Sequence, residues 1–315
     1  MLDETVKNHT RLTVLPVWAC IICYHANVDS LQALASILTP QVDRILLLDN
    51  SPGFCIDIEQ VCGPKITYVS MSVNVGTAGA LNRAWSLAIE GQAGAMVSFD
   101  QDSLPTHDLV GKLSRAHHEL SRQYGMVAAV GPSIQDPRSG RTARLRRPQT
   151  FFRTHQAACS GSPVQVDHLI TSGCLITTEL YQTVGAFSND LFLDYVDIEW
   201  SLRARALGFH LYVAQNLAME HTIGDNIMFF GGRTLPIHEP IRNYLLIRNH
   251  LLLWRLPAPK LIWLMSDFRQ VTLKLLITLA FQPKRVERIR WIVRGIVHGL
   301  RGLGGSPHWS SSTQA

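Results

Sequence analysis

Short apolar runs alternate with amphipathic stretches along the first hundred residues of the chain. The apolar runs predict strands at Ala19–Tyr24, Arg44–Leu48 and Ile66–Ser70. Apolar positions at helical spacing predict helices at Ser30–Leu38 and Ala80–Ile89. Each predicted strand ends in polar or glycine-rich residues. Strands that alternate with helices in this way indicate an α/β fold, with a mostly parallel central sheet flanked by helices.

A fourth apolar run, Ala93–Val97, is followed by Asp100-Gln101-Asp102, two aspartates in D-x-D spacing. A strand that ends in paired carboxylates places oxygen ligands at the sheet edge where open α/β sheets bind their ligands. Mg²⁺ and Mn²⁺ prefer such ligands and commonly bridge carboxylates to phosphates. The motif therefore predicts a metal-assisted reaction on a phosphorylated donor, with a chance loop as the alternative. His221 ends a later apolar run and is either structural or a further ligand beside Asp102.

A glycine-containing turn, Asn74–Asn82, joins the third predicted strand to its helix. Glycines let a backbone approach a ligand closely, and a helix N-terminus favours anionic groups. The turn has neither the G-x-G-x-x-G nor the Walker A pattern. It is therefore either part of a nucleotide pocket of another kind or only a tight turn.

Three carboxylates gather at the start of another predicted helix: Asp194, Asp197 and Glu199. Residues three and four apart share a helix face, so Glu199 is expected to pair with Arg203 and to leave Asp197 available for proton transfer. The alternative is that these acids only cap the helix and compensate its dipole.

The composition is that of a globular protein, because 46% of the 315 residues are hydrophobic. Cys20 and Cys23 form a C-x-x-C inside a predicted strand, with no second ligand pair at zinc spacing. We therefore expect them to be buried structural residues in a reducing compartment. The N-terminus lacks a basic segment followed by an apolar one, so no secretory signal is expected.

Charge is distributed unevenly along the chain. From Pro240 onward there are 12 lysines and arginines against two acids, a net charge of +10, whereas the preceding part carries −5. The chain is predicted to be helical from about Leu235. A basic end on an acidic body indicates that this end meets something anionic. A nucleic acid is not the expected partner, because no nucleic-acid-binding motif accompanies the charge.

Within this end, Leu261–Phe281 is strongly apolar but contains Asp267, Arg269 and Lys274. Central charges are costly in a spanning helix, so a transmembrane segment is not expected. Basic residues beside apolar ones fit a segment that lies on an anionic membrane surface. Helices that pack on their own catalytic domain, or on a second subunit of a homo-oligomer, are the alternative. The basic loop Pro137–Arg153 is either solvated or a lid over the substrate.

Several short motifs follow one another along the chain in a recognisable order. They are Asp49-Asn50-Ser51, Asn74-Val75-Gly76 with Ala80-Leu81-Asn82, Asp100-Gln101-Asp102, Thr171-Ser172-Gly173, Asp194 to Trp200, His221 with Gly224, and Arg242-Asn243-Tyr244 with Arg248-Asn249. Together they resemble the family-2 inverting glycosyltransferases of GT-A fold, and most closely the branch that transfers rhamnose from dTDP-L-rhamnose in bacterial polysaccharide assembly. The resemblance covers about Val17 to Gly305. We therefore expect a GT-A catalytic domain over 12–235, a basic amphipathic helical extension over 236–301, and a disordered tail over 302–315.

The resemblance implies a role for each motif. Asp197 would be the catalytic base, although Val196 stands where the broad family carries glutamate, which leaves Glu199 open as the alternative. Asp102 and His221 would bind Mg²⁺ or Mn²⁺. The residues implied in nucleotide-sugar binding are Tyr24, Asp49, Asn74, Gly76, Asn82 and Asp100. Those implied on the acceptor side are Ser172, Gly173, Asp194, Tyr195 and Trp200.

The implied activity is metal-dependent transfer of rhamnose from dTDP-L-rhamnose to a hydroxyl of a lipid-linked saccharide, in synthesis of cell-envelope polysaccharide. The expected location is the cytoplasm, peripheral to the inner face of the membrane. The alternatives are another NDP-hexose donor, such as UDP-glucose or UDP-galactose, and a carbohydrate-binding relative without turnover. A sugar-phosphate nucleotidyltransferase is disfavoured, because no glycine-rich basic loop near the N-terminus would hold a triphosphate.

Overall fold

The computed structural model describes residues 16–53, 61, 63–138, 140–142, 161–221, 226–230 and 233–307. Of Arg141 and of residues 226–230 and 233–237 only the backbone is described. Most of the predicted lid Pro137–Arg153, the motif residue Gly224 and the end of the predicted tail lie outside these residues.

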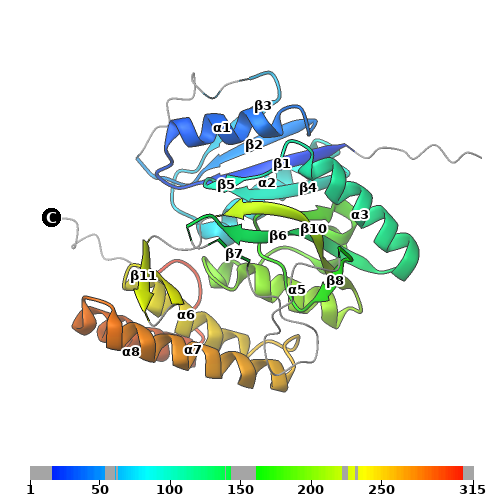
Figure 1. Ribbon diagram of the computed structural model, residues 1–315. Helices are drawn as coiled ribbons and strands as arrows, with labels where there is room; N and C mark the ends of the chain where they lie inside the picture. The colour runs from blue at the N-terminus through cyan, green and yellow to red at the C-terminus, as the bar shows by residue number, and fades with distance from the viewer. Residues whose placement is uncertain are drawn as a thin grey trace, which may run out of the picture.

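A parallel sheet forms the N-terminal half of the molecule. Its strands are β1 (Val17–Cys23), β2 (Arg44–Asp49), β3 (Ile66–Ser70) and β4 (Ala95–Asp100), in the spatial order β3-β2-β1-β4. All three pairings between them are parallel. The connections include α1 (Val28–Leu38) and α2 (Gly76–Glu90). The predicted strands and helices of this half are therefore confirmed, and their polar ends meet at one edge of the sheet (Figure 1).

The second half of the sheet is mixed. The strand β9 (Cys174–Thr177) runs antiparallel between β4 and β6 (Val127–Asp136), and β10 (His210–His221) runs parallel to β6. The remaining strands are short: β5 (Ser103–Leu104), β7 (Arg141–Thr142) and β8 (Val164–Val166). The helices are α3 (Leu109–Tyr124), α4 (Thr178–Val184), the single turn η2 (Asn189–Leu191) and α5 (Val196–Ala206).

The core lies on both faces of the sheet, because successive strand residues point to opposite faces. In β1, Trp18 and Cys20 face the apolar layer that contains α2, whereas Ile21 and Cys23 face the layer that contains α1 and α3. Burial raises the pKa of both cysteine thiols well above the ordinary value. The prediction of buried structural cysteines is confirmed.

The C-terminal part was predicted to be helical from about Leu235, but it begins with a β-hairpin. A hairpin of β11 (Asn226–Phe230) and β12 (Arg233–Ile237) occupies the region expected to open the helical segment. Helices follow as α6 (Ile241–Leu253), α7 (Leu261–Phe281) and α8 (Arg285–Arg301). These three helices gather on the side of the molecule away from α1 (Figure 1). Within the described residues, no helix is both long and apolar enough to cross a membrane.

Glycines bring α8 close against α6. A Cβ at Gly295 would lie 2.7 Å from the carbonyl oxygen of Tyr244, and one at Gly299 would lie 3.0 Å from that of Arg248. Real Cβ atoms do not approach so closely, so these glycines fix the packing of the two helices. Within the helical end, α8 therefore packs tightly on α6.

Candidate active site at the carboxyl edge of the sheet

The pairing of β5 with β10 brings His221 beside the D-x-D motif, more than a hundred residues away in sequence. In this antiparallel pair His221 lies opposite Ser103, the residue after Asp102. His221 Nε2 is 3.5 Å from Asp100 Oδ2, and its Nδ1 is 3.4 Å from Asp102 Oδ1. Ligand atoms of the three side chains all lie within 4.8 Å of one another. The predicted pairing of Asp102 with His221 is thus seen in the geometry, and Asp100 joins them.

The chemistry of this cluster fits a divalent cation. Two carboxylates and an imidazole are ligands that Mn²⁺ accepts, and carboxylates suit Mg²⁺. His221 Nδ1 is buried and makes no hydrogen bond of ordinary geometry among the described residues. Burial by itself would lower the pKa of His221, but the close approach of Asp102 and the charge of Asp100 raise it overall. The histidine thus sits in a strongly negative environment that a cation would neutralise.

The D-x-D backbone is held in place by side chains around it. The Gln101 amide accepts a hydrogen bond from Tyr24 N at 2.7 Å and donates one to Tyr24 O at 3.2 Å. Ser172 Oγ accepts from Asp100 N at 3.3 Å and lies 2.5 Å from Ser103 Oγ. Ser172 is buried and supports the backbone of the D-x-D segment; its implied acceptor-side role stays a prediction.

The backbone around Gly173 requires a glycine at this position. Its φ is +76°, and a Cβ there would lie 2.7 Å from the ring of Pro132. Its N–H donates to the carbonyl oxygen of Ser98 at 2.7 Å, which joins the start of β9 to β4. This residue therefore sets the approach of two strands at the site and offers no side chain to an acceptor.

A strained loop leads into α5 and presents its acids to the same edge. Phe192, Asp194 and Tyr195 all have positive φ, a conformation that non-glycine residues adopt only where their surroundings enforce it. Asn249 of α6 supplies that enforcement. Its Nδ2 lies within hydrogen-bonding distance of the carbonyl oxygens of Leu191, Leu193 and Asp194, at 2.7 to 2.9 Å.

Gly76 approaches this loop from the other side. A Cβ on Gly76 would lie 2.3 Å from the carbonyl oxygen of Phe192, and the φ of Gly76 is +71°. The neighbouring Ala78 N donates to that same oxygen at 3.2 Å. Gly76 is therefore required for packing against the strained loop, a role distinct from the implied contact with nucleotide.

Asp197 and Glu199 have different environments. Glu199 is buried, and each of its carboxylate oxygens accepts a hydrogen bond from Arg203. Nε donates to Oε1 and Nη2 donates to Oε2, both at 2.9 Å. The predicted pair is confirmed. Asp197 is partly exposed and accepts one hydrogen bond, from Ile198 N at 2.8 Å. Burial raises the pKa of Asp197 to about 7, and the charges of Asp194 and Asp100 act in the same direction.

The coupling between these charges locates Asp197 near the D-x-D. The charge of Asp100 raises the pKa of Asp197, so the two carboxylates lie close enough to interact. A pKa near neutrality is what a general base requires, because the group must be ionised at the working pH and still bind a proton. Of the two acids left open by the sequence, the geometry favours Asp197 and gives Glu199 a structural partner.

Arg242, at the start of α6, bridges the loop and the cluster. Its guanidinium donates to Asp194 Oδ1 at 2.7 Å. Burial raises the pKa of Asp100, and the charges of Arg242 and His221 oppose that increase. A guanidinium at this edge of the sheet is suited to a substrate that carries phosphate. The sequence motif contained Arg242 without showing that it would reach Asp194.

The residues implied in nucleotide binding are mostly occupied within the protein. Asn82 donates to Phe187 O and Asn189 Oδ1 and accepts from Tyr181 and Phe187 N, so its amide is fully used in holding the loop after α4. Its amide is thus engaged within the protein, and the implied contact with a nucleotide stays a prediction.

Asp49 and Asn74 also bind their neighbours. Asp49 is fully buried and accepts from Tyr68 Oη at 2.7 Å and from Ser51 N at 3.1 Å. Asn74 accepts from Asn50 Nδ2 at 3.0 Å and from Gly76 N at 2.9 Å. Both side chains therefore hold the chain together at the carboxyl ends of β2 and β3. Tyr24, in contrast, is 51% exposed and presents its ring beside the D-x-D.

Two further residues implied on the acceptor side are buried as well. Trp200 donates from Nε1 to Gly185 O at 2.9 Å and packs against Phe187, so it belongs to the core. Tyr195 donates to Asp267 Oδ2 at 2.6 Å. Both side chains are thus used in contacts within the protein, and their implied acceptor-side role stays a prediction. Of the implied acceptor residues, Asp194 remains partly exposed at the cleft.

Sequence reasoning missed the partner of Tyr195. Asp267 of α7 is buried and also lies 2.9 Å from His250 Nδ1, while Trp254 Nε1 donates to His250 Nε2 at 2.9 Å. The signal was present as a single acid in an otherwise apolar helix. Its distant partners, however, are visible only once α6 and α7 are placed beside the loop before α5.

Comparisons with known proteins agree with this architecture. No family model matches the chain. The chain is 26% identical over 301 residues to the dTDP-rhamnosyl transferase RfbF of Shigella flexneri, an alignment that covers 94% of this chain and 99% of that protein. Among solved structures, GalNAc-T7 with UDP, GalNAc and Mn²⁺ matches with a TM-score of 0.54 at 12% identity, over 84% of this chain. The match spans 56% of the GalNAc-T7 chain, and it shows the GT-A fold.

Proposed function

We propose that this chain, a glycosyltransferase of GT-A fold homologous to a dTDP-rhamnosyl transferase, inverts the anomeric carbon as it transfers rhamnose from dTDP-L-rhamnose to a saccharide hydroxyl. The observation that carries the proposal is that a candidate cation site and a candidate base lie at the same edge of the sheet. A cation-binding cluster of Asp100, Asp102 and His221 lies beside an electrostatically coupled carboxylate, Asp197, whose pKa is raised to about 7. That combination serves a nucleotide-sugar donor and an acceptor hydroxyl together.

The donor would bind at the carboxyl edge of β1 and β4. Asp102, His221 and Asp100 would hold Mn²⁺ or Mg²⁺. When bound, the cation would neutralise charge on the diphosphate leaving group. Tyr24 offers its exposed ring to the base, and Arg242 adds positive charge beside Asp194. These contacts would orient the anomeric carbon toward the α5 side of the cleft.

The reaction would be a single displacement. The acceptor oxygen forms a bond to the anomeric carbon as the bond from that carbon to the phosphate oxygen breaks. Asp197 takes the acceptor's proton, and dTDP leaves. Attack opposite the leaving group inverts the anomeric centre. Asp197 projects from the first turn of α5, and the strained loop before it holds the helix start at this edge.

A donor screen tests this proposal. The full chain with Mn²⁺ or Mg²⁺ is incubated with dTDP-rhamnose, UDP-glucose, UDP-galactose or GDP-mannose, and released nucleotide is measured. Release from dTDP-rhamnose alone, lost on chelation of the metal, is the expected result. Release from a UDP-hexose instead would replace the donor and keep the reaction class. No release from any donor, in the presence of saccharide acceptors, would leave the carbohydrate-binding alternative standing.

The cell-envelope setting follows from the same proposal. A rhamnosyl acceptor in polysaccharide synthesis is commonly a saccharide on a lipid carrier, and such an acceptor would be reached from the cytoplasmic side of a membrane. A homo-oligomer is compatible with this arrangement and is tested below together with the membrane contact.

A further inference from the structure

The outer faces of α7 and α8 carry apolar side chains that no other described part of the chain covers. On α8 these are Val286, Ile289, Val293, Ile296, Val297 and Leu300, which recur at spacings of three and four residues. Val286 is 65% exposed and Leu300 is 63% exposed. The same periodicity places them on one stripe of the helix. A stripe of this length on a soluble surface marks a contact with something apolar.

Helix α7 has a matching stripe. Its exposed members are Leu261, Ile262, Met265, Phe268, Leu273 and Leu276. Its opposite face holds the buried Asp267, which bonds His250 of α6. On α8, Gly295 and Gly299 are likewise the positions that approach α6. Each helix therefore turns its inner face toward α6 and its apolar stripe away from it.

The charge around these stripes is mostly positive. Beside the α8 stripe lie the exposed arginines Arg290, Arg294 and Arg301, and Arg269 lies within the α7 stripe. Among the described residues from Trp254 to Pro307, the acids are Asp267, which is buried, and Glu287. An apolar stripe bordered by arginines is the pattern of a helix that lies in a membrane interface and attracts anionic lipid.

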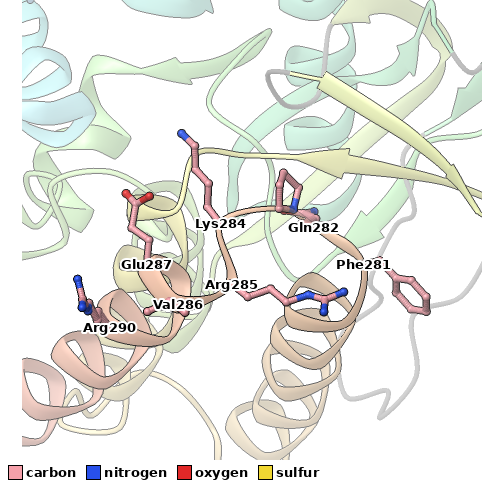
Figure 2. Close-up of a pocket in the computed structure, with 8 residues that line it drawn as sticks. Phe281, Gln282, Lys284, Arg285, Val286, Glu287 and Arg290 are labelled. Carbon is pink, nitrogen blue, oxygen red and sulfur yellow. The ribbon is translucent and has the colours of Figure 1, made fainter.

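The turn between the two helices extends this surface. An open hollow of about 810 Å³ lies there, and its lining includes Phe281, Lys284, Arg285 and Arg290 (Figure 2). Phe281 offers an apolar ring, while the three basic side chains come from around the same turn (Figure 2). Glu287 is the acid in this lining. The hollow thus combines an apolar part with basic groups suited to lipid phosphates.

A smaller cavity lies next to this turn. Gln282 lines both the hollow and that cavity, whose other walls include Asp194, Arg242 and Lys274. Asp194 and Arg242 are the ion pair beside the cation-binding cluster. The turn therefore lies close to the ion pair of Asp194 with Arg242.

We propose that the outer faces of α7 and α8, with the turn between them, dock this protein on an anionic lipid bilayer. Self-association through the same surface is disfavoured by its charge. A two-fold contact brings the same patch of both copies together, so arginines would meet arginines. The membrane contact itself does not require the proposed activity, but delivery of a lipid-linked acceptor to the cleft rests on it.

The experiment measures co-sedimentation of the full chain with vesicles. We expect binding to vesicles of phosphatidylcholine with phosphatidylglycerol, weak binding to phosphatidylcholine alone, and release in about 1 M salt, where the Debye length is about 3 Å. Arg290→Gln with Arg294→Gln should lower partitioning about 30-fold, at about 1 kcal/mol for each basic residue near the surface. Val293→Ser with Ile289→Ser should weaken binding at low salt as well.

A matched control separates a local face from net charge. Arg115→Gln with Arg122→Gln removes two exposed arginines from α3 and changes the net charge equally. It should bind vesicles like the unchanged protein. An equal loss in the control would overturn the proposal, as would binding that ignores lipid charge. So would loss of a dimer, seen by light scattering, in the α8 variants without loss of vesicle binding. Nucleotide release from soluble acceptor analogues, measured in parallel, keeps a failure of docking distinct from a failure of catalysis.

Discussion

Replacement of Asp197 with asparagine should lower activity and raise stability at the same time. The carboxylate of Asp197 is held where burial and two neighbouring acids disfavour its ionised form. Catalysis needs that ionised form, because only it can accept the acceptor's proton. An asparagine at this position would keep the shape of the side chain and an oxygen to accept from Ile198 N, without the charge. The substitution therefore separates the effect of this charge on turnover from its effect on the free energy of unfolding.

The size of the stability change follows from the pKa. The difference between 3.8 and about 7 corresponds to about 4 kcal/mol, at 1.36 kcal/mol for each tenfold change in proton affinity. Solvent screens the partly exposed carboxyl and reduces this energy, so we expect a stability difference of about 2 kcal/mol. Between these two pH values the native state keeps a proton that the unfolded chain has lost. The free energy of unfolding of the unchanged protein therefore falls as pH rises from about 4 to about 7.

The assay compares denaturant unfolding and turnover of both proteins across this pH range. Above pH 7 the free energy of unfolding of Asp197→Asn should exceed that of the unchanged protein by about 2 kcal/mol, so the variant should unfold at a higher denaturant concentration. Near pH 4 the two proteins should be equally stable. Turnover should fall by about 10²- to 10⁴-fold with nucleotide affinity retained. Glu179→Gln, which neutralises an exposed acid at the start of α4, is the control and should change neither. A variant that is less stable at high pH, or that turns over normally, would refute the reasoning.

Three further substitutions test the site and its supports. Asp102→Ala should weaken Mn²⁺ binding, measured by calorimetry, and make nucleotide affinity insensitive to the metal; an affinity that still responds to Mn²⁺ would contradict the ligand role. Gly76→Ala should destabilise the fold by about 3 kcal/mol or more, because of its positive φ and the collision with a carbonyl of the loop before α5. Gly111→Ala, in open space on α3, should instead be neutral or slightly stabilising. Tyr195→Phe should cost about 1–3 kcal/mol by removing a donor from the buried Asp267, and should lower kcat more than it changes KM; an unchanged kcat would show that this contact does not position the catalytic loop.

The parallel half of the sheet could be predicted from the sequence because its rules are local. Apolar runs such as Ile66–Ser70 are bounded by turn residues, and helices between strands force them to be parallel. The carboxyl ends of such strands meet at one edge, so the D-x-D had to lie there. The pair of Glu199 with Arg203 was predictable for the same reason, since helix spacing alone brings the two together.

The mixed half and the buried polar residues could not be predicted in this way. The strand β9 is only four residues long and inserts antiparallel between β4 and β6, a choice made by tertiary packing. Ser172 and Trp200 look like surface chemistry in sequence because both lie in motifs with polar neighbours. Their burial depends on which element covers them, and one sequence contains no signal for that. His221 was left open in the sequence as either structural or a ligand, and only the pairing of β10 with β5 places it beside Asp102.

The helical extension is physically part of the candidate site. Each non-glycine residue held at positive φ costs about 1–3 kcal/mol, and the loop before α5 contains three of them. Contacts from outside the loop offset that cost. Asn249 of α6 binds its carbonyl groups, Arg242 binds Asp194, and Asp267 of α7 binds Tyr195. The orientation of α5, and with it the placement of Asp197, the proposed base, is therefore set by helices that follow the sheet in the chain. If the same helices rest on a bilayer, the membrane contact and the geometry of the cleft share one rigid support.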